Sequence, residues 1–298
     1  METLKKHLVR IALGFLLTLL LLGHAARLYQ IPFISQLDAI IYDTRLRLTM
    51  PQTVDDRIVI LDIDEKSLKA EGRWPWSRNR LALLMDKLFD KYGVAVAGFD
   101  IVFAEKDESS GLKILQEMGG KQLEDDARFQ AALEKIRPQL EYDRLFAGSI
   151  RNRSVILGYY FSTSEGAGGE EAGTLPPPVL PTGTFAGRGI PFEKGYGYGS
   201  NLPELMQAAA GAGHFNPITD FDGVARRVPL LVEFKGAYYE SLSLAVVRAL
   251  FDFPKVVPGI PDANTSKDYL GLEWLELQGE NFSLKIPVDH NVCALVPY

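Results

Sequence analysis

Residues 57–64 read RIVILDID and residues 94–103 read VAVAGFDIVF, and these two apolar stretches decide the fold. Each is a short apolar run of the kind found in a strand that is buried on both faces. Between them, Ser77 can cap a helix with one apolar face that runs to Tyr92 and ends at Gly93. The order strand, helix, strand predicts a parallel βαβ unit with a right-handed crossover.

The rest of the chain alternates helix-like and strand-like segments. Helices are expected at 125–136, 202–210 and 241–251, and strands at 154–162, 214–216, 224–234, 272–277, 282–288 and 292–296. The pattern predicts an α/β fold with a mixed sheet and flanking helices.

Residues 163–190 interrupt this pattern because they are rich in Gly, Pro, Ser and Thr. We expect a flexible loop there that packs no core. It is either an insertion in one domain or a linker between two.

The N-terminal segment predicts one membrane-spanning helix. Residues 11–26 read IALGFLLTLLLLGHAA, a stretch that spans about 24 Å as a helix. Arg10 and Arg27 can snorkel outward and extend this span toward bilayer thickness. The apolar spacing over 28–48 predicts that the helix continues beyond the membrane.

We therefore assign residues 1–10 to the cytoplasm, 11–27 to a transmembrane signal anchor and 28–298 to the periplasmic side of the inner (cytoplasmic) membrane. In the alternative, the leader is a signal peptide, and a secreted solute-binding or scaffold protein is released after Ala25.

Charge and cysteine content narrow the function classes. The formal net charge is −6, and the first 26 residues carry +2, so the body carries −8. Because an acidic body repels phosphates, we expect no nucleic-acid partner. The single cysteine, Cys293, allows no intramolecular disulfide. A buried apolar role is favoured for it over a reactive thiol.

Three acidic residues follow apolar stretches, namely Asp62, Asp64 and Asp100. At the carboxyl ends of parallel strands they can converge on one crevice that binds a cation. They can instead be structural, with Asp64 capping the next helix and Arg73 or Arg78 pairing with the carboxylates. The first hypothesis makes the protein an extracytoplasmic metal-dependent hydrolase, and the second makes the acids part of an ion-pair network.

Other motifs favour structural roles. Asp220-x-Asp222-Gly223 resembles the start of a calcium loop, but Ala225 cannot coordinate the ion, so a tight Asp-Gly turn explains it better. The four histidines lack metal-ligand spacing, and no nucleotide-binding fingerprint occurs. We expect no metal, no cofactor and no catalytic residue.

Several motifs together resemble the second class of CHASE domain. They are Tyr42-Asp43-x-Arg45, RIVILDIDEKSL, Trp74-Pro75-Trp76-Ser77-Arg78, GFDIVFAEKD, HFNPITDFDGVARRVPLLVEF and SLSLAVVRAL, in the order of that family. These domains are extracytoplasmic sensors of bacterial adenylate and guanylate cyclases, histidine kinases and serine/threonine kinases.

The resemblance implies a sensory input domain with an unknown extracytoplasmic ligand. It implies a nucleotide cyclase as the parent protein, with a kinase as the alternative, and a homodimer in the full-length receptor. The apolar end CALVPY predicts a domain truncated at its C-terminus. No catalytic residue is carried over, and the motif positions to inspect are Asp62, Asp64, Trp74, Pro75, Arg78, Asp100, Asp222 and Arg226.

Overall fold

The computed structural model describes residues 2–26, 28–50, 53, 55–164, 169–260 and 271–296. The chain divides into two compact units, Met1–Ile60 with Pro297–Tyr298, and Leu61–Val296.

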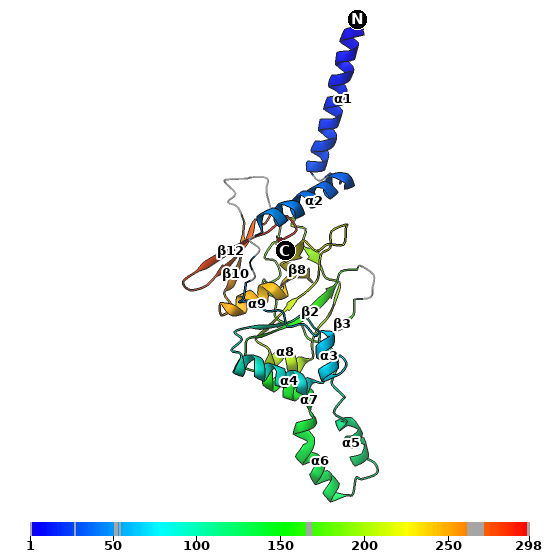
Figure 1. Ribbon diagram of the computed structural model, residues 1–298, viewed down its shortest axis with the longest axis vertical. Coiled ribbons are helices and arrows are strands. Elements are labelled where there is room, and N and C mark those ends of the chain that lie inside the picture. Colours follow the sequence, from blue (N-terminus) through cyan, green and yellow to red (C-terminus); the bar gives the residue numbers. More distant parts are fainter. Residues whose placement is uncertain are drawn as a thin grey trace. The chain divides into compact units, whose positions relative to one another are not determined.

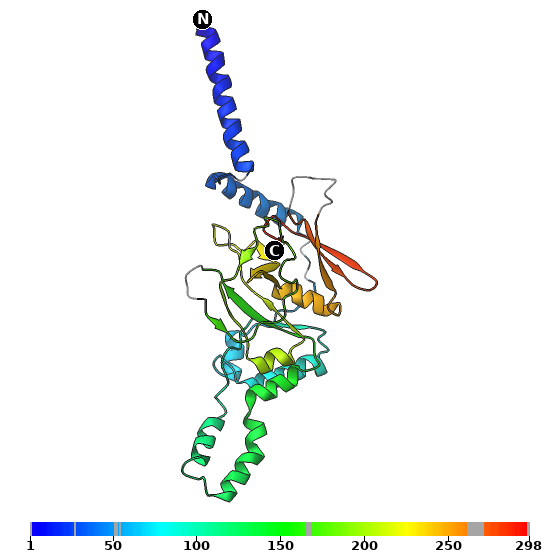
Figure 2. The same ribbon diagram turned by 180° about the vertical axis from the view of Figure 1, so that it is seen from behind.

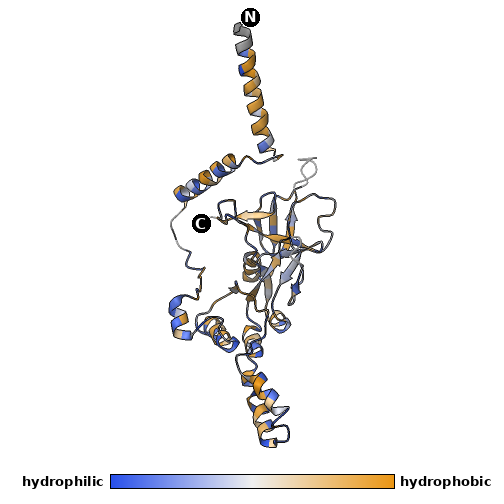
Figure 3. Cartoon of the chain, turned by 90° about the vertical axis from the view of Figure 1, so that its right-hand side faces the viewer, coloured by the Kyte–Doolittle hydropathy of each residue, from blue (hydrophilic) through white to orange (hydrophobic). Residues whose placement is uncertain are grey.

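The first unit is helical and contains the helices α1 (Glu2–Ala25) and α2 (Pro32–Thr49). Within α1, the 19 residues His7–Ala25 have a mean hydropathy of 2.0. Figure 3 shows the hydrophobic colour along most of this helix. A helix of that length spans about 28 Å, close to the thickness of the hydrocarbon core. It is the one helix in the described part of the chain that is long and apolar enough to cross a membrane.

The expected continuation of this helix through residue 48 is wrong in one respect, because α2 is a separate helix. Its first residue is Pro32, and Ile31 before it is extended, with φ −99° and ψ 108°. Proline has no N–H to continue a helix and pushes the preceding residue out of the helical region.

The central sheet of the second unit is mixed, as expected. Strand β2 (Val155–Ser162) pairs in parallel with β1 (Ala97–Phe99) on one side and with β6 (Gly211–His214) on the other. The far end of β2 pairs antiparallel with β5 (Gly197–Gly199), which pairs in parallel with β3 (Glu171–Ala172).

Helices cover both faces of this sheet (Figure 1). One face packs on α4 (Arg78–Asp86), α7 (Tyr142–Ile150) and α8 (Pro203–Ala208), which bury Leu81, Phe146 and Leu205. The other face packs on α9 (Leu242–Leu250). The apolar spacing that predicted the helix at 78–92 is confirmed, because α4 runs on into a π-helical turn, η1 (Lys87–Lys91), and Gly93 has a φ of +63°.

A second core lies among the C-terminal strands. They form three small sheets. The first joins β4 (Glu193–Lys194), β8 (Leu231–Phe234) and β9 (Ala237–Glu240). The second pairs β7 (Arg227–Pro229) with β13 (Cys293–Leu295), and the third is the meander of β10 (Lys255–Gly259), β11 (Trp274–Gln278) and β12 (Ser283–Pro287). Leu180 and Phe185 are buried in this core. The expectation that 163–190 packs no core is therefore wrong for its second half.

Two further segments complete the second unit. Helix α3 (Glu65–Glu71) precedes α4, and a hairpin of α5 (Leu112–Gly119) and α6 (Ala127–Leu140) projects away from the sheet (Figure 2). Helix α6 confirms the expected helix at 125–136.

The strand predicted at 57–64 does not form, and the expected βαβ unit is therefore wrong. Residues 58–64 carry no ladder, and Ile58, Val59, Ile60 and Leu61 are 58–89% exposed. The second predicted strand is reduced to β1. An apolar run needs a paired neighbour to become a strand, and local composition does not supply one.

The buried side chain of Asn201 connects two backbone segments of the central sheet by hydrogen bonds. It is fully buried, its Oδ1 accepts a hydrogen bond from Phe103 N at 2.7 Å, and its Nδ2 donates to Gly158 O at 2.9 Å. The side chain thus joins β2 to the segment that follows β1.

We expect Asn201→Ala to lower the free energy of unfolding by about 2–4 kcal/mol, because both backbone groups would stay buried without a partner. Urea denaturation of the purified chain measures this loss. The control is the exposed Asn281→Ala, for which we expect a change within about 0.5 kcal/mol. Equal midpoints for the two variants would contradict the role given to Asn201.

Candidate functional site

The three acidic residues Asp62, Asp64 and Asp100 do not form a metal site. Asp62 and Asp100 are exposed, and Asp64 caps α3 by accepting hydrogen bonds from Ser67 N and Oγ, both at 2.7 Å. These bonds lower the pKa of the Asp64 carboxyl. Within the described ranges, no group of three or more His, Cys, Asp or Glu side chains could hold a metal ion. The capping interpretation of Asp64 is confirmed, and the acidic crevice is not found.

The Trp-Pro-Trp motif forms a corner between α3 and α4. The Trp74–Pro75 peptide bond is cis, and the indole Nε1 of Trp76 donates a hydrogen bond to Gly72 O at 2.9 Å. The rings of Trp74 and Trp76 meet edge to face with centroids 5.9 Å apart. The corner places Arg78 at the first residue of α4.

Arg78 lies in a largely buried cluster with Phe103, Asp107 and Asp143, which we call the Arg78 cluster. Its Nε lies 3.5 Å from Asp143 Oδ1, and both side chains are only 11% exposed. Its guanidinium lies 4.4 Å from the centre of the Phe103 ring, where a cation is attracted by the ring face.

Backbone hydrogen bonds close the Arg78 cluster. Asp107 Oδ2 accepts a hydrogen bond from Arg78 N at 2.6 Å, and Asp143 Oδ2 accepts one from Asp107 N at 2.8 Å. Asp107 therefore caps α4. Ser77 stands at the predicted capping position, but its hydroxyl bonds Asn79 instead.

Burial is the main cause of the pKa shifts in this cluster. It lowers the pKa of Arg78, although the nearby carboxylates of Asp143 and Asp107 oppose that shift. It also raises the pKa of Asp143. The guanidinium of Arg78 thus pairs with Asp143, while Asp107 accepts a hydrogen bond from the Arg78 backbone. The expectation that Arg78 pairs with Asp62, Asp64 or Asp100 is wrong.

Sequence reasoning missed Asp107 and Asp143 as partners. Asp107 is the last residue of the motif GFDIVFAEKD, and its place in that motif was the sequence signal that could have marked it as a partner. Asp143 carries a weaker one, because an acid in the first turn of a helix interacts favourably with the helix dipole.

A surface hollow of about 400 Å³ borders the Arg78 cluster, and Asp107 and Asp143 form part of its lining. Other charged side chains around it include Lys106, Lys113 and Glu204. Ligand pockets for apolar molecules are lined mostly by hydrophobic groups. This hollow is instead lined largely by polar and charged side chains.

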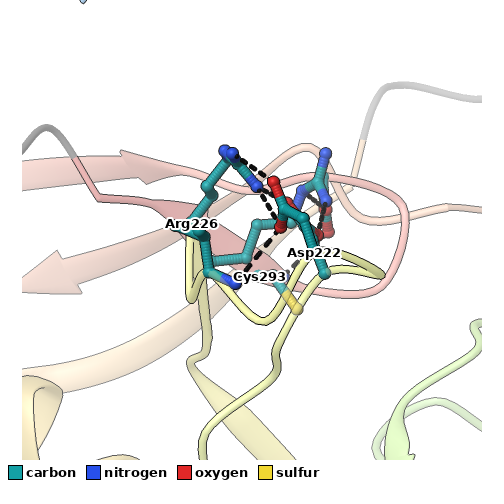
Figure 4. Close-up of polar contacts among 7 residues, drawn as sticks. Asp222, Arg226 and Cys293 are labelled. Carbon is teal, nitrogen blue, oxygen red and sulfur yellow. Dashed lines mark hydrogen bonds and ion pairs between the residues drawn. The ribbon is translucent and has the colours of Figure 1, made fainter. Parts of the chain in front are cut away.

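A second cluster surrounds Arg226, and we call it the Arg226 cluster (Figure 4). Arg226 is 4% exposed, its Nη1 lies 3.0 Å from Asp220 Oδ2, and its Nη2 lies 2.8 Å from Asp222 Oδ2. Arg227 bridges Asp220 at 3.0 Å and Asp289 at 3.3 Å. The hydrogen bond with Arg226 lowers the pKa of Asp222 to about 2.

The Arg226 cluster fastens the strand β7 to its neighbour β13. Gly223, with a φ of +80°, forms the predicted tight turn, and Gly223 N donates to Asp220 O. Asp289 Oδ1 accepts hydrogen bonds from Asn291 N and Cys293 N. The carboxylates of Asp220 and Asp222, which would bind the ion in a calcium loop, instead form ion pairs with arginines.

Cys293 lies beside this cluster in β13 and is 1% exposed. Burial raises the pKa of its thiol to about 12. The interpretation of Cys293 as a buried apolar side chain is confirmed, since a thiol with that pKa is unreactive at neutral pH.

For the Arg78 cluster, we expect Arg78→Met to lower the free energy of unfolding by about 3–5 kcal/mol, because Asp143 would remain buried without its cation. Urea denaturation measures the loss. The matched control is Arg80→Met, which removes an exposed pair with Glu71 and should cost about 1 kcal/mol or less. A similar small loss in both variants would contradict a buried pair.

For the Arg226 cluster, the sign of the acid dependence follows from Asp222. Its folded-state pKa of about 2 lies below the ordinary 3.8, so its contribution to stability is present above pH 3.8 and is lost as the pH falls toward 2. We expect Asp222→Asn to flatten the loss of stability between pH 4 and pH 2 in acid titrations followed by circular dichroism. The exposed Asp252→Asn should keep the original slope, and an equal flattening there would contradict the assignment.

A comparison with known families identifies the chain. The family model of the CHASE2 domain matches residues 13–298, which include both arginine clusters. No curated protein and no solved structure matches the chain. CHASE2 domains are extracellular sensory domains of signalling receptors, and this chain belongs to the CHASE2 family.

Proposed function

We propose that this chain is the sensory input domain of a receptor in the inner membrane, with its second unit in the periplasm and an adenylate or guanylate cyclase as the output. The observation that carries the proposal is the family match over residues 13–298. Helix α1 supplies the anchor, and Lys5, Lys6 and Arg10 favour a cytoplasmic N-terminus.

The domain itself acts by binding rather than by catalysis. The sensory role of the family supports this, and so does the structural use of the conspicuous acids, since Asp64 caps a helix and Asp222 pairs with Arg226. A histidine or serine/threonine kinase is the alternative output.

The hollow beside the Arg78 cluster is the site that we propose for the stimulus. Its charged lining suits a small polar ligand, and Asp107 and Asp143 connect it directly to α4 and α7. A ligand that binds one arrangement of these helices better than another shifts the population between them. In the full-length receptor this shift acts on a homodimer, because cyclase catalysis pairs two chains.

Topology is tested with reporter fusions. We expect alkaline phosphatase to be active, and β-galactosidase inactive, when either is joined after Met50 or after Val296. The reverse is expected for fusions after Arg10. Active β-galactosidase after Val296 would place the second unit in the cytoplasm and contradict the proposal.

The fate of α1 is tested by fractionation. An anchored chain stays in the membrane pellet after a carbonate wash and keeps its original N-terminus. A soluble periplasmic protein that begins at Ala26 would establish the secreted alternative.

The output is tested on membranes that contain the full-length protein. We expect synthesis of a cyclic nucleotide from ATP or GTP. Autophosphorylation without cyclase activity would replace the cyclase by a kinase and leave the sensory assignment intact.

A further inference from the structure

We propose that the core of this sensory domain contains a binding site for ordered water, built by Tyr159 of β2 and His214 of β6. The site is independent of the surface hollow and of the output domain.

The sheet register brings the two side chains together. Tyr159 and His214 are direct partners in the parallel pairing of β2 with β6. Direct partners on neighbouring strands point to the same face of a sheet. Their ring centroids are 6.5 Å apart, and the ring of Phe161 lies 6.1 Å from that of His214.

Both side chains lie fully inside the protein. Tyr159 is 0% exposed and His214 is 1% exposed. Within the part of the chain that the structure describes, the Tyr159 hydroxyl has no hydrogen-bond partner, and the ring of His214 has at most one, the backbone of Tyr239. A buried polar atom without a partner costs about 1–3 kcal/mol, and such atoms are rare in folded proteins.

The two groups are neutral, and this selects the ligand. Burial lowers the pKa of His214 to about 3 against the opposing effect of a backbone hydrogen bond with Tyr239, so the imidazole is uncharged at neutral pH and keeps one ring nitrogen for a further partner. Burial raises the pKa of Tyr159, and the negative charge of Glu240 raises it further. The hydroxyl therefore stays protonated. Neutral donors and acceptors favour a neutral hydrogen-bonding guest over an ion.

Water fits these requirements. Globular proteins hold about one buried water per 27 residues, and each makes two to four hydrogen bonds to otherwise unpartnered groups. Glu240 offers a third polar atom nearby: one carboxylate oxygen bonds Arg248, while Oε2 is buried and has no partner among the described residues. Ser241, the next residue, pairs with His214 across the sheet.

The sign of one stability change separates a hydrated site from a dry one. If water satisfies the hydroxyl, Tyr159→Phe removes a hydrogen bond, and we expect the Tm to fall by about 2–4 °C. If the hydroxyl has no partner, the same change removes a penalty and the Tm rises. Tyr160→Phe is the matched control, because the neighbouring tyrosine is 47% exposed, and its Tm should not change.

A second measurement uses the unaltered chain and does not depend on a variant. In a high-resolution crystal structure we expect a density peak within about 3.2 Å of Tyr159 Oη or of a ring nitrogen of His214. A Tyr159→Phe variant that is as stable as the original chain or more stable, or a core without such a peak, would overturn the proposal.

Discussion

Strand β2 is buried on both faces from Val155 to Tyr159, and the layers of the second unit follow from that constraint. A strand with apolar side chains on both faces needs a helical layer on each side. Helices α4, α7 and α8 provide one layer and α9 provides the other. Gly158 is part of the same constraint, because a side chain there would reach within 2.3 Å of Phe99 O and separate β1 from β2.

Two buried arginines connect segments of the second unit through ion pairs. Arg78 joins the start of α4 to Asp107 and to the first turn of α7, and Arg226 holds the turn before β7. Buried ion pairs add little net stability compared with apolar side chains of similar size, but breaking one is costly. This explains how charged motif residues serve as internal cross-links of a sensor.

The sensory role of the family suggests why buried ion pairs connect distant segments of this domain. A receptor domain must convert a weak binding event into a choice between two packing arrangements. The Arg78 cluster connects the lining of the hollow with two helices that pack on the central sheet. The polar pair of Tyr159 and His214 lies within the sheet itself and is fully buried.

The sequence by itself determined the features that depend on neighbouring residues. The apolar leader, the spacing over 78–92, the cap at Asp64 and the Asp-Gly turn are local patterns, and the structure contains each of them. The order of the motifs also identified the family. What these patterns have in common is that hydrogen bonds and helical periodicity over a few residues are enough to specify them.

The tertiary structure alone decided which distant groups meet. Arg78 reaches Asp107 across 29 residues, and Asp107 reaches Asp143 across a further 36, so no local spacing reveals the cluster. The apolar run at 57–64 has strand-like composition but no paired neighbour, and Leu180 and Phe185 are buried although their segment looked like a loop. Strand pairing and burial depend on what the rest of the chain places alongside a segment, and that is a property of the whole fold.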